Sequence, residues 1–161
     1  MEKIKTNAMR ALERAGVKYN AYTYDSDGAI DGISVAEKIG RPVEQVYKTL
    51  VTQGTGREYF VFVIPVAEEL DLKAAARAVG EKAVEMIKVT DINKVTGYIR
   101  GGCSPIGMKK EYRTVLDSSC EALDTIIVSA GKIGHQIELA PLDLVKLTHC
   151  KIENIAIKRN I

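Results

Sequence analysis

The sequence contains few of the side chains from which metal centres and thiol-based active sites are built. Its 161 residues include only two histidines and three cysteines, the latter at Cys103, Cys120 and Cys150. The cysteines are odd in number, widely spaced and without a C-x-x-C pair. This argues against the disulfide framework of a small secreted protein and against a four-ligand zinc site. We therefore predict reduced thiols, no metal and no cofactor.

Long hydrophobic segments are also missing. The longest run of apolar residues extends only from Tyr59 to Ala67 and contains Pro65, whereas a membrane-spanning helix requires about 20 such residues. Residues 1–7 carry charges and are not followed by an apolar segment, so a secretory signal is not predicted. We expect a cytoplasmic protein that has no membrane partner.

The chain has no marked excess of one charge sign. Lys and Arg total 23 and Asp and Glu total 21, which gives a net charge of +2. Strong sequence-independent binding to a nucleic acid is therefore not predicted, and any such contact should be local. Apolar residues (46%) and charged residues (27%) are present in ordinary globular proportions. The length suits one domain of about 150 residues, which we take to span residues 1–161.

Local periodicity and capping residues divide the chain into short helices and strands. Helices are predicted over residues 4–15, 34–39, 72–79, 90–95 and 141–147. Strands are predicted over residues 19–24, 46–52, 59–64, 113–116, 125–129 and 135–139. Because the strands do not alternate with long helices, we predict an α/β fold with a mixed β-sheet or barrel flanked by helices, not a doubly wound sheet.

Two acidic or polar clusters are interpreted as the beginnings of helices. Residues 34–37 have the capping-box pattern, so Ser34 should begin a helix that Gly40 ends. The carboxylates of residues 68–71 are assigned to a further helix start, where negative charge suits the helix dipole.

A predicted hairpin of residues 46–52 and 59–64 contains a lysine among apolar neighbours. Its second strand is apolar on both faces and should be central. Alternation along the first strand places Lys48 on the face of Val46 and Leu50. Burying an ammonium group there would cost several kcal/mol, so one interpretation is that Lys48 serves a ligand. The other is that Lys48 protects an edge strand against aggregation, or that its apolar stem lies on the core while its charged end reaches water.

Two glycine-rich segments are candidates for contact with a ligand. Residues 101–107 contain three glycines and a proline, and their amide N–H groups could bind a carbonyl or an oxyanion. A plain connecting loop explains the same composition. Residues 129–134 combine a serine, a lysine and two glycines, which suits an anion-binding nest but equally a hairpin turn. Neither segment matches a phosphate-binding loop.

Cys103 is a candidate nucleophile, but a cysteine nucleophile requires a base. Only His135 and His149 could supply one, and their distance from the thiol is unknown. A small thiol that packs within the loop is the preferred interpretation.

Taken together, seven short motifs resemble the YbaK/EbsC family of aminoacyl-tRNA deacylases, and most closely its Cys-tRNA(Pro) deacylase branch. They occur in order over nearly the whole chain, at residues 22–24, 45–50, 70–73, 84–86, 96–98, 101–105 and 129–132. The resemblance implies a mixed β-sheet that closes into a barrel, related to the editing domain of some prolyl-tRNA synthetases.

The resemblance also implies hydrolysis of the ester that joins a mischarged amino acid, chiefly cysteine, to the 3′ end of tRNA(Pro). It assigns catalysis to Lys48, with the cysteine thiol or the ribose hydroxyl of the substrate assisting. It assigns substrate binding to Tyr24, Gly101, Gly102, Cys103, Ser104, Pro105, Ser129, Gly131 and Lys132. The implied partners are the acceptor end of aminoacyl-tRNA and prolyl-tRNA synthetase.

Three residues depart from the family pattern and leave the substrate open. Cys103 replaces an isoleucine, and Ala130 and Ile133 replace a glycine and a cation. A methylene group discriminates by only about 1–3 kcal/mol, so another misacylated tRNA such as Ala-tRNA(Pro) is an alternative substrate. A non-catalytic module that binds an aminoacyl or nucleotide end is a second alternative, and a cysteine hydrolase is a third.

Overall fold

The computed structural model describes residues 5–26 and 31–158. Its helices are α1 (Asn7–Arg14), α2 (Gly32–Ile39), α3 (Leu72–Val79), α4 (Ile92–Thr96) and α5 (Pro141–Thr148), with 3-10 turns at Val43–Gln45, Val89–Asp91 and Ser118–Ala122. Its strands are β1 (Asn20–Thr23), β2 (Tyr47–Gly54), β3 (Tyr59–Pro65), β4 (Glu68–Leu70), β5 (Val84–Met86), β6 (Arg113–Asp117), β7 (Ile126–Lys132), β8 (His135–Leu139), β9 (Lys151–Glu153) and β10 (Ala156–Lys158). Within the described ranges, no helix has the length and hydrophobicity needed to cross a membrane.

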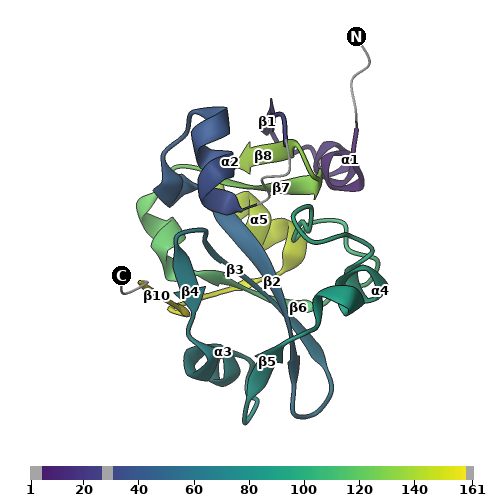
Figure 1. Ribbon diagram of the computed structural model, residues 1–161, viewed down its shortest axis with the longest axis vertical. Coiled ribbons are helices and arrows are strands. Elements are labelled where there is room, and N and C mark those ends of the chain that lie inside the picture. The colour runs from purple at the N-terminus through teal and green to yellow at the C-terminus, as the bar shows by residue number, and fades with distance from the viewer. Residues whose placement is uncertain (1–4, 27–30, 159–161) are drawn as a thin grey trace.

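A five-stranded sheet is built around the predicted hairpin. Its strand order is β5-β2-β3-β6-β9, with β3 in the centre. The hairpin strands pair antiparallel, with Leu50 opposite Phe62, and β6 pairs parallel to β3. These long strands run down the middle of the molecule in Figure 1. The predictions of the hairpin and of a central second strand are confirmed.

A separate three-stranded sheet has the order β1-β8-β7 and lies across the upper part of Figure 1. The two sheets meet at a single parallel bridge between Val46 and Ile127. Among the described residues no sheet closes on itself, so the predicted barrel is wrong although the mixed α/β fold is confirmed. The edge strands are β1 and β7 in the three-stranded sheet and β5 and β9 in the five-stranded sheet.

The N-terminal cap of α2 differs from the predicted one. Gly40 ends α2 in a left-handed conformation, as predicted, but its N-cap is Asp31 and not Ser34. The Asp31 carboxylate accepts hydrogen bonds from the backbone N–H and the hydroxyl of Ser34, both at 2.9 Å. An aspartate is at least as good an N-cap as a serine, so the helix begins one turn earlier.

Of the acidic residues predicted to begin α3, only Asp71 does so. Asp71 is the N-cap of α3, and it accepts from the N–H groups of Lys73 and Ala74 at 3.1 Å. Glu68 and Glu69, however, lie in β4, which pairs with β10. The partner strand comes from a distant part of the sequence, and no local pattern indicates it.

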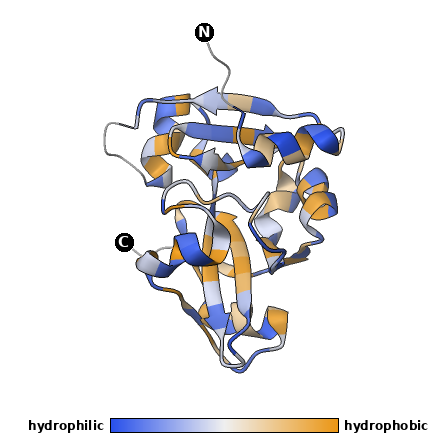
Figure 2. Ribbon diagram, turned by 90° about the vertical axis from the view of Figure 1, so that its right-hand side faces the viewer, coloured by the Kyte–Doolittle hydropathy of each residue, from blue (hydrophilic) through white to orange (hydrophobic). Residues whose placement is uncertain are grey.

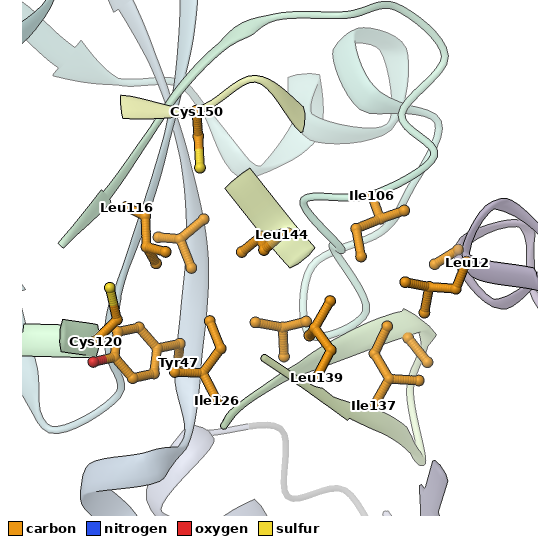
Figure 3. Close-up of a cluster of buried hydrophobic side chains, with 14 of the residues drawn as sticks. Leu12, Tyr47, Ile106, Leu116, Cys120, Ile126, Ile137, Leu139, Leu144 and Cys150 are labelled. Atoms are coloured by element: carbon orange, nitrogen blue, oxygen red, sulfur yellow. The ribbon is translucent and has the colours of Figure 1, made fainter. Parts of the chain in front are cut away.

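The largest hydrophobic core lies under one face of the three-stranded sheet. Figure 3 shows its side chains converging from α1, α5 and both sheets. Strand residues with alternate numbers, among them Ile126, Ile137 and Leu139, are at most 1% exposed. Figure 2 shows hydrophobic colour concentrated on the long central strands. The opposite face of the three-stranded sheet, which carries Ser129 and Gln136, is therefore available for a site.

Candidate functional site

A cavity of about 570 Å³ lies between the two sheets, within the range of small-molecule sites. Its walls come from the start of α2, the first half of β2, the loop before Cys103, and neighbouring positions of β7 and β8. Four residues singled out in the sequence line it, namely Lys48, Gly101, Cys103 and Ser129. Segments more than fifty residues apart in the sequence thus meet around one space.

Lys48 reaches the cavity because of the alternation along β2. Tyr47 is 2% exposed and belongs to the main core, so Lys48 faces the other way. Its neighbours on that face are Val46, which is buried, and Leu50, which is half-buried. The ammonium group is therefore attached to a largely apolar wall, where an anionic or carbonyl ligand would compensate its lost hydration.

The loop that carries Gly101 has a constrained backbone. Gly101 has φ +86°, a conformation that side chains other than glycine rarely adopt. The N–H of Gly102 donates to the carbonyl of Ile99 at 3.0 Å. A Cβ atom at Gly102 would stand 3.1 Å from the backbone nitrogen of Ile133. The loop is therefore pressed against the turn between β7 and β8, and of the two glycines only Gly101 lines the cavity.

The remaining residues of this loop support it from beneath. Ser104 and Pro105 are buried and do not line the cavity. The hydroxyl oxygen of Ser104 accepts a hydrogen bond from the N–H of Ile106 at 3.2 Å. These two residues support the loop and lie outside the lining of the cavity.

The turn between β7 and β8 contributes its serine but not its lysine. Ser129 lines the cavity, and its hydroxyl oxygen accepts from the N–H of Gly131 at 3.2 Å. Gly131 itself packs on the ring of Tyr98. Lys132 is exposed, and neither it nor Gly131 is part of the lining.

Tyr24 lies beside the site without lining it. Its N–H donates to the carbonyl of Gly134 at 3.0 Å, which ties the end of β1 to the turn after β7. Its hydroxyl is buried and has no hydrogen-bond partner among the described residues. Tyr24 thus combines a backbone link to this turn with a buried hydroxyl that has no partner among the described residues.

Four polar residues of the cavity were not predicted, namely Asp31, Thr49, Arg100 and Gln136. Gln136 is only 5% exposed, and its side-chain amide makes no hydrogen bond to the residues that the structure describes. It stands opposite Ser129 across the β7–β8 pair. The alternation of β8, with apolar side chains at positions 137 and 139, was the signal that could have identified it.

The titration behaviour of the cavity does not suit a cysteine nucleophile. Burial raises the pKa of Cys103 from an ordinary 9.0 to about 11, so its thiol is neutral near physiological pH. Burial, with a smaller effect of Lys132, lowers the pKa of His135, and His135 is not part of the lining. No thiol and base are paired around the cavity within the described residues.

The described residues contain no group of three or more potential metal-ligating side chains, and Cys103, Cys120 and Cys150 are free. The polar groups that the cavity offers are an ammonium, a guanidinium, hydroxyls, an amide, the backbone of Gly101 and the carboxylate of Asp31, which caps α2. Such a set can bind a carbonyl, a ribose hydroxyl or a phosphate, and can stabilise negative charge as it develops on an ester oxygen.

Comparison with known proteins defines the class to which this fold and cavity belong. The model of the aminoacyl-tRNA editing domain family matches residues 31–147, which include every described lining residue of the cavity. The chain therefore belongs to the aminoacyl-tRNA editing domain family. This agrees with the resemblance seen in the sequence motifs.

Comparison with individual proteins supports the same family assignment. A protein of Enterococcus faecalis named "Putative Cys-tRNA(Pro)/Cys-tRNA(Cys) deacylase EbsC" is 48% identical over 155 residues, which cover 96% of this chain and 94% of that protein. A solved structure described as "a putative trans-editing enzyme for prolyl tRNA synthetase" has a TM-score of 0.81 at 22% identity and covers 98% of this chain and 100% of its own. A hypothetical protein has a TM-score of 0.87 at 17% identity and covers 94% of this chain and 100% of its own. The two structures show the shared fold.

Proposed function

We propose that this chain hydrolyses the ester bond of misacylated aminoacyl-tRNA, with Cys-tRNA(Pro) as its substrate. The observation that carries the proposal is that Lys48 and Gly101 line one cavity. Membership of the editing-domain family and the name of the 48% identical relative support it. The cavity would receive the aminoacyl group and the terminal nucleotide of the acceptor end.

The residues of the cavity suit a reaction that depends on position and charge. An aminoacyl ester is already activated, so holding it in the correct orientation and stabilising the developing oxyanion is enough for catalysis. In the proposed arrangement Lys48 orients the carbonyl or the terminal nucleotide, and the backbone of Gly101 frames the aminoacyl group. The guanidinium of Arg100 stands at the same cavity, where it can contact a phosphate.

The nucleophile is proposed to come from the substrate or from water. The neutral thiol of Cys103 favours this assignment. The carboxylate of Asp31 also lines the cavity, but it accepts two hydrogen bonds from Ser34 as the N-cap of α2. In one route the cysteine thiol of the substrate attacks its own carbonyl carbon and forms a cyclic thioester, which water then opens to free cysteine. In the other route the ribose hydroxyl orients an attacking water and relays its proton, and the free amino acid forms directly. In both routes the bond between the carbonyl carbon and the 3′ oxygen breaks, and that oxygen takes up the proton released by the thiol or the water to restore the tRNA hydroxyl.

Prolyl-tRNA synthetase is proposed as a protein partner. The net charge of only +2 predicts weak binding to tRNA by this chain alone. A synthetase that already holds tRNA(Pro) would supply the missing affinity.

The test is incubation of the purified chain with Cys-, Ala-, Ser- and Pro-tRNA(Pro), following the loss of each ester against the spontaneous rate. We expect the largest acceleration with Cys-tRNA(Pro) and none with Pro-tRNA(Pro). Preference for the alanyl ester would change the proposed substrate and keep the reaction. Binding without acceleration of any ester would refute hydrolysis and identify a binding module.

A further inference from the structure

A buried carboxylate lies two residues along β8 from Gln136, which lines the cavity. It has no part in the chemistry proposed above. Glu138 is 6% exposed and stands on β8 on the same face as Gln136. Its oxygens accept hydrogen bonds from the hydroxyl of Tyr22 at 2.6 Å and from the amide of Asn20 at 3.3 Å. Both of these donors lie on β1, so this half of the cluster belongs to the three-stranded sheet alone.

The other donors connect Glu138 to the segment that leads into β2. The amide nitrogen of Gln45 donates to Glu138 at 2.9 Å, and the guanidinium of Arg41 donates at 3.2 Å. Arg41 also donates to the amide oxygen of Gln45 at 2.9 Å. Thr125, directly before β7, donates to Glu138 and accepts from Gln45. The cluster therefore ties the approach to β2 to the three-stranded sheet.

This tie lies on the cavity side of the junction between the sheets. On the other side, Tyr47 is buried in the main core. The backbone bridge between Val46 and Ile127 lies between the Glu138 cluster and Tyr47. The start of β2 is thus held by the core, by the bridge and by the Gln45–Glu138 contact, and Lys48 is the first residue beyond these three restraints.

The carboxylate of Glu138 is suited to this task because it is charged. Burial alone would raise the pKa of Glu138, but hydrogen bonds from Thr125, Tyr22 and Asn20, with the charge of Arg41, outweigh it and lower the pKa. An ionised carboxylate makes shorter and stronger hydrogen bonds than a neutral acceptor. Leaving such a buried network half-satisfied is costly, which makes its geometry well defined.

We propose that Glu138 is a positioning residue that acts through Gln45 to hold Lys48 in the cavity. Glu138 touches no substrate in this assignment. It sets the direction in which β2 leaves the junction, and so the place of the ammonium group relative to Ser129 and Gln136 on the facing wall. Its consequence for catalysis rests on the proposed function, whereas its consequence for Lys48 does not.

The first test measures Lys48 without any substrate. The rate at which an amine-specific reagent labels Lys48 is followed by mass spectrometry in Glu138→Gln and in Gln45→Ala. The second variant cuts the link while Tyr22 and Arg41 still bond to Glu138. Glu81→Gln is the control, because Glu81 accepts from the N–H of Gly56 at 3.1 Å at the far end of the same hairpin.

We expect severalfold faster labelling of Lys48 in both cluster variants and no change in the control. The combined variant Gln45→Glu with Glu138→Gln exchanges donor and acceptor and keeps a carboxylate beside Arg41, so it should restore slow labelling. Unchanged labelling in the cluster variants, or an equal change in the control, would overturn the proposal. Failure of the exchange to restore slow labelling in a folded protein would also count against it.

The second test asks whether Glu138 acts through Lys48 in hydrolysis. Glu138→Gln should lower kcat for Cys-tRNA(Pro) by about tenfold or more, measured well below the unfolding midpoint. In a Lys48→Ala background the same change should cost less than about twofold. Equal losses in both backgrounds would contradict positioning through Lys48. If labelling behaves as expected but the unaltered chain hydrolyses no misacylated tRNA, the proposed function is wrong and the positioning of Lys48 stands.

Discussion

The hydroxyl of Tyr98 donates a hydrogen bond of 2.6 Å to the carbonyl of Ile106, beneath the loop that carries Gly101. Tyr98 is 7% exposed, and burial raises its pKa to about 12, so it remains a donor at all ordinary pH values. Its ring also packs against Gly131. One side chain therefore supports two of the glycine-rich segments around the cavity.

Tyr98→Phe tests this support. The change leaves a buried carbonyl without its donor, which should cost about 1–3 kcal/mol of unfolding free energy, measured by urea denaturation. Deacylation should fall because the loop is less well fixed. Tyr112→Phe is the matched control, since its hydroxyl donates to the carbonyl of Val95 at 2.6 Å away from the cavity lining. Equal activity losses in the two variants would contradict a role specific to Tyr98.

Lys48→Ala tests the residue on which the proposed function most depends. Removal of one group that stabilises a developing oxyanion lowers the rate by about a hundredfold or more, and we expect a loss of this size in Cys-tRNA(Pro) hydrolysis. Lys73→Ala, at an exposed position of α3, should leave the rate unchanged. Circular dichroism would establish that both variants are folded. Full activity of folded Lys48→Ala would show that the assigned role is wrong.

Gly101→Ala separates backbone strain from function. A side chain at φ +86° costs about 1–2 kcal/mol, and a methyl group would also enter the lining of the cavity. We expect lower stability and a large loss of deacylation. Gly80→Ala provides the comparison, because Gly80 has φ +74° at the end of α3. It should lose similar stability and keep its activity, and loss of activity there would weaken the case for the loop.

Gln136→Leu is expected to change binding without harming the fold. The buried amide of Gln136 has no partner among the described residues, so an apolar residue of similar size should leave the unfolding free energy equal or higher. If the amide contacts the substrate, KM should rise about fivefold to tenfold. If KM is unchanged and the unfolding free energy increases in Gln136→Leu, Gln136 has no part in substrate binding.

Cys103→Ser tests both the thiol and the pH dependence of stability. The folded state raises the pKa of Cys103 from 9.0 to about 11. The unfolded chain therefore loses its proton first as pH rises, and stability decreases between these two values by on the order of 1 kcal/mol per unit. Below the lower value the contribution is complete. The serine variant should show a shallower alkaline decline in denaturation curves and retain deacylation, whereas abolished activity would restore the nucleophile hypothesis.

Local sequence signals predicted most helices, the hairpin and the loop with Gly101, since caps and turns depend on neighbouring residues. They did not predict β4, because its partner β10 lies some ninety residues away. They overestimated closure of the sheets into a barrel, because pairing between distant edges has no local signal. At the site, Lys48 was visible as a cation in an apolar strand, but Gln136 was not singled out, since only the paired sheet reveals that it faces the cavity.

The suppressed ionisation of Cys103 has a consequence for a cavity proposed to receive a cysteine ester. A thiolate there could attack the ester carbonyl, release the tRNA and retain the amino acid as a thioester, which would block turnover. It could also exchange with a passing disulfide to form a mixed disulfide and release the other thiol. The neutral thiol does neither at an appreciable rate. The cavity wall can thus contain the thiol of Cys103 without trapping a cysteine ester as a thioester.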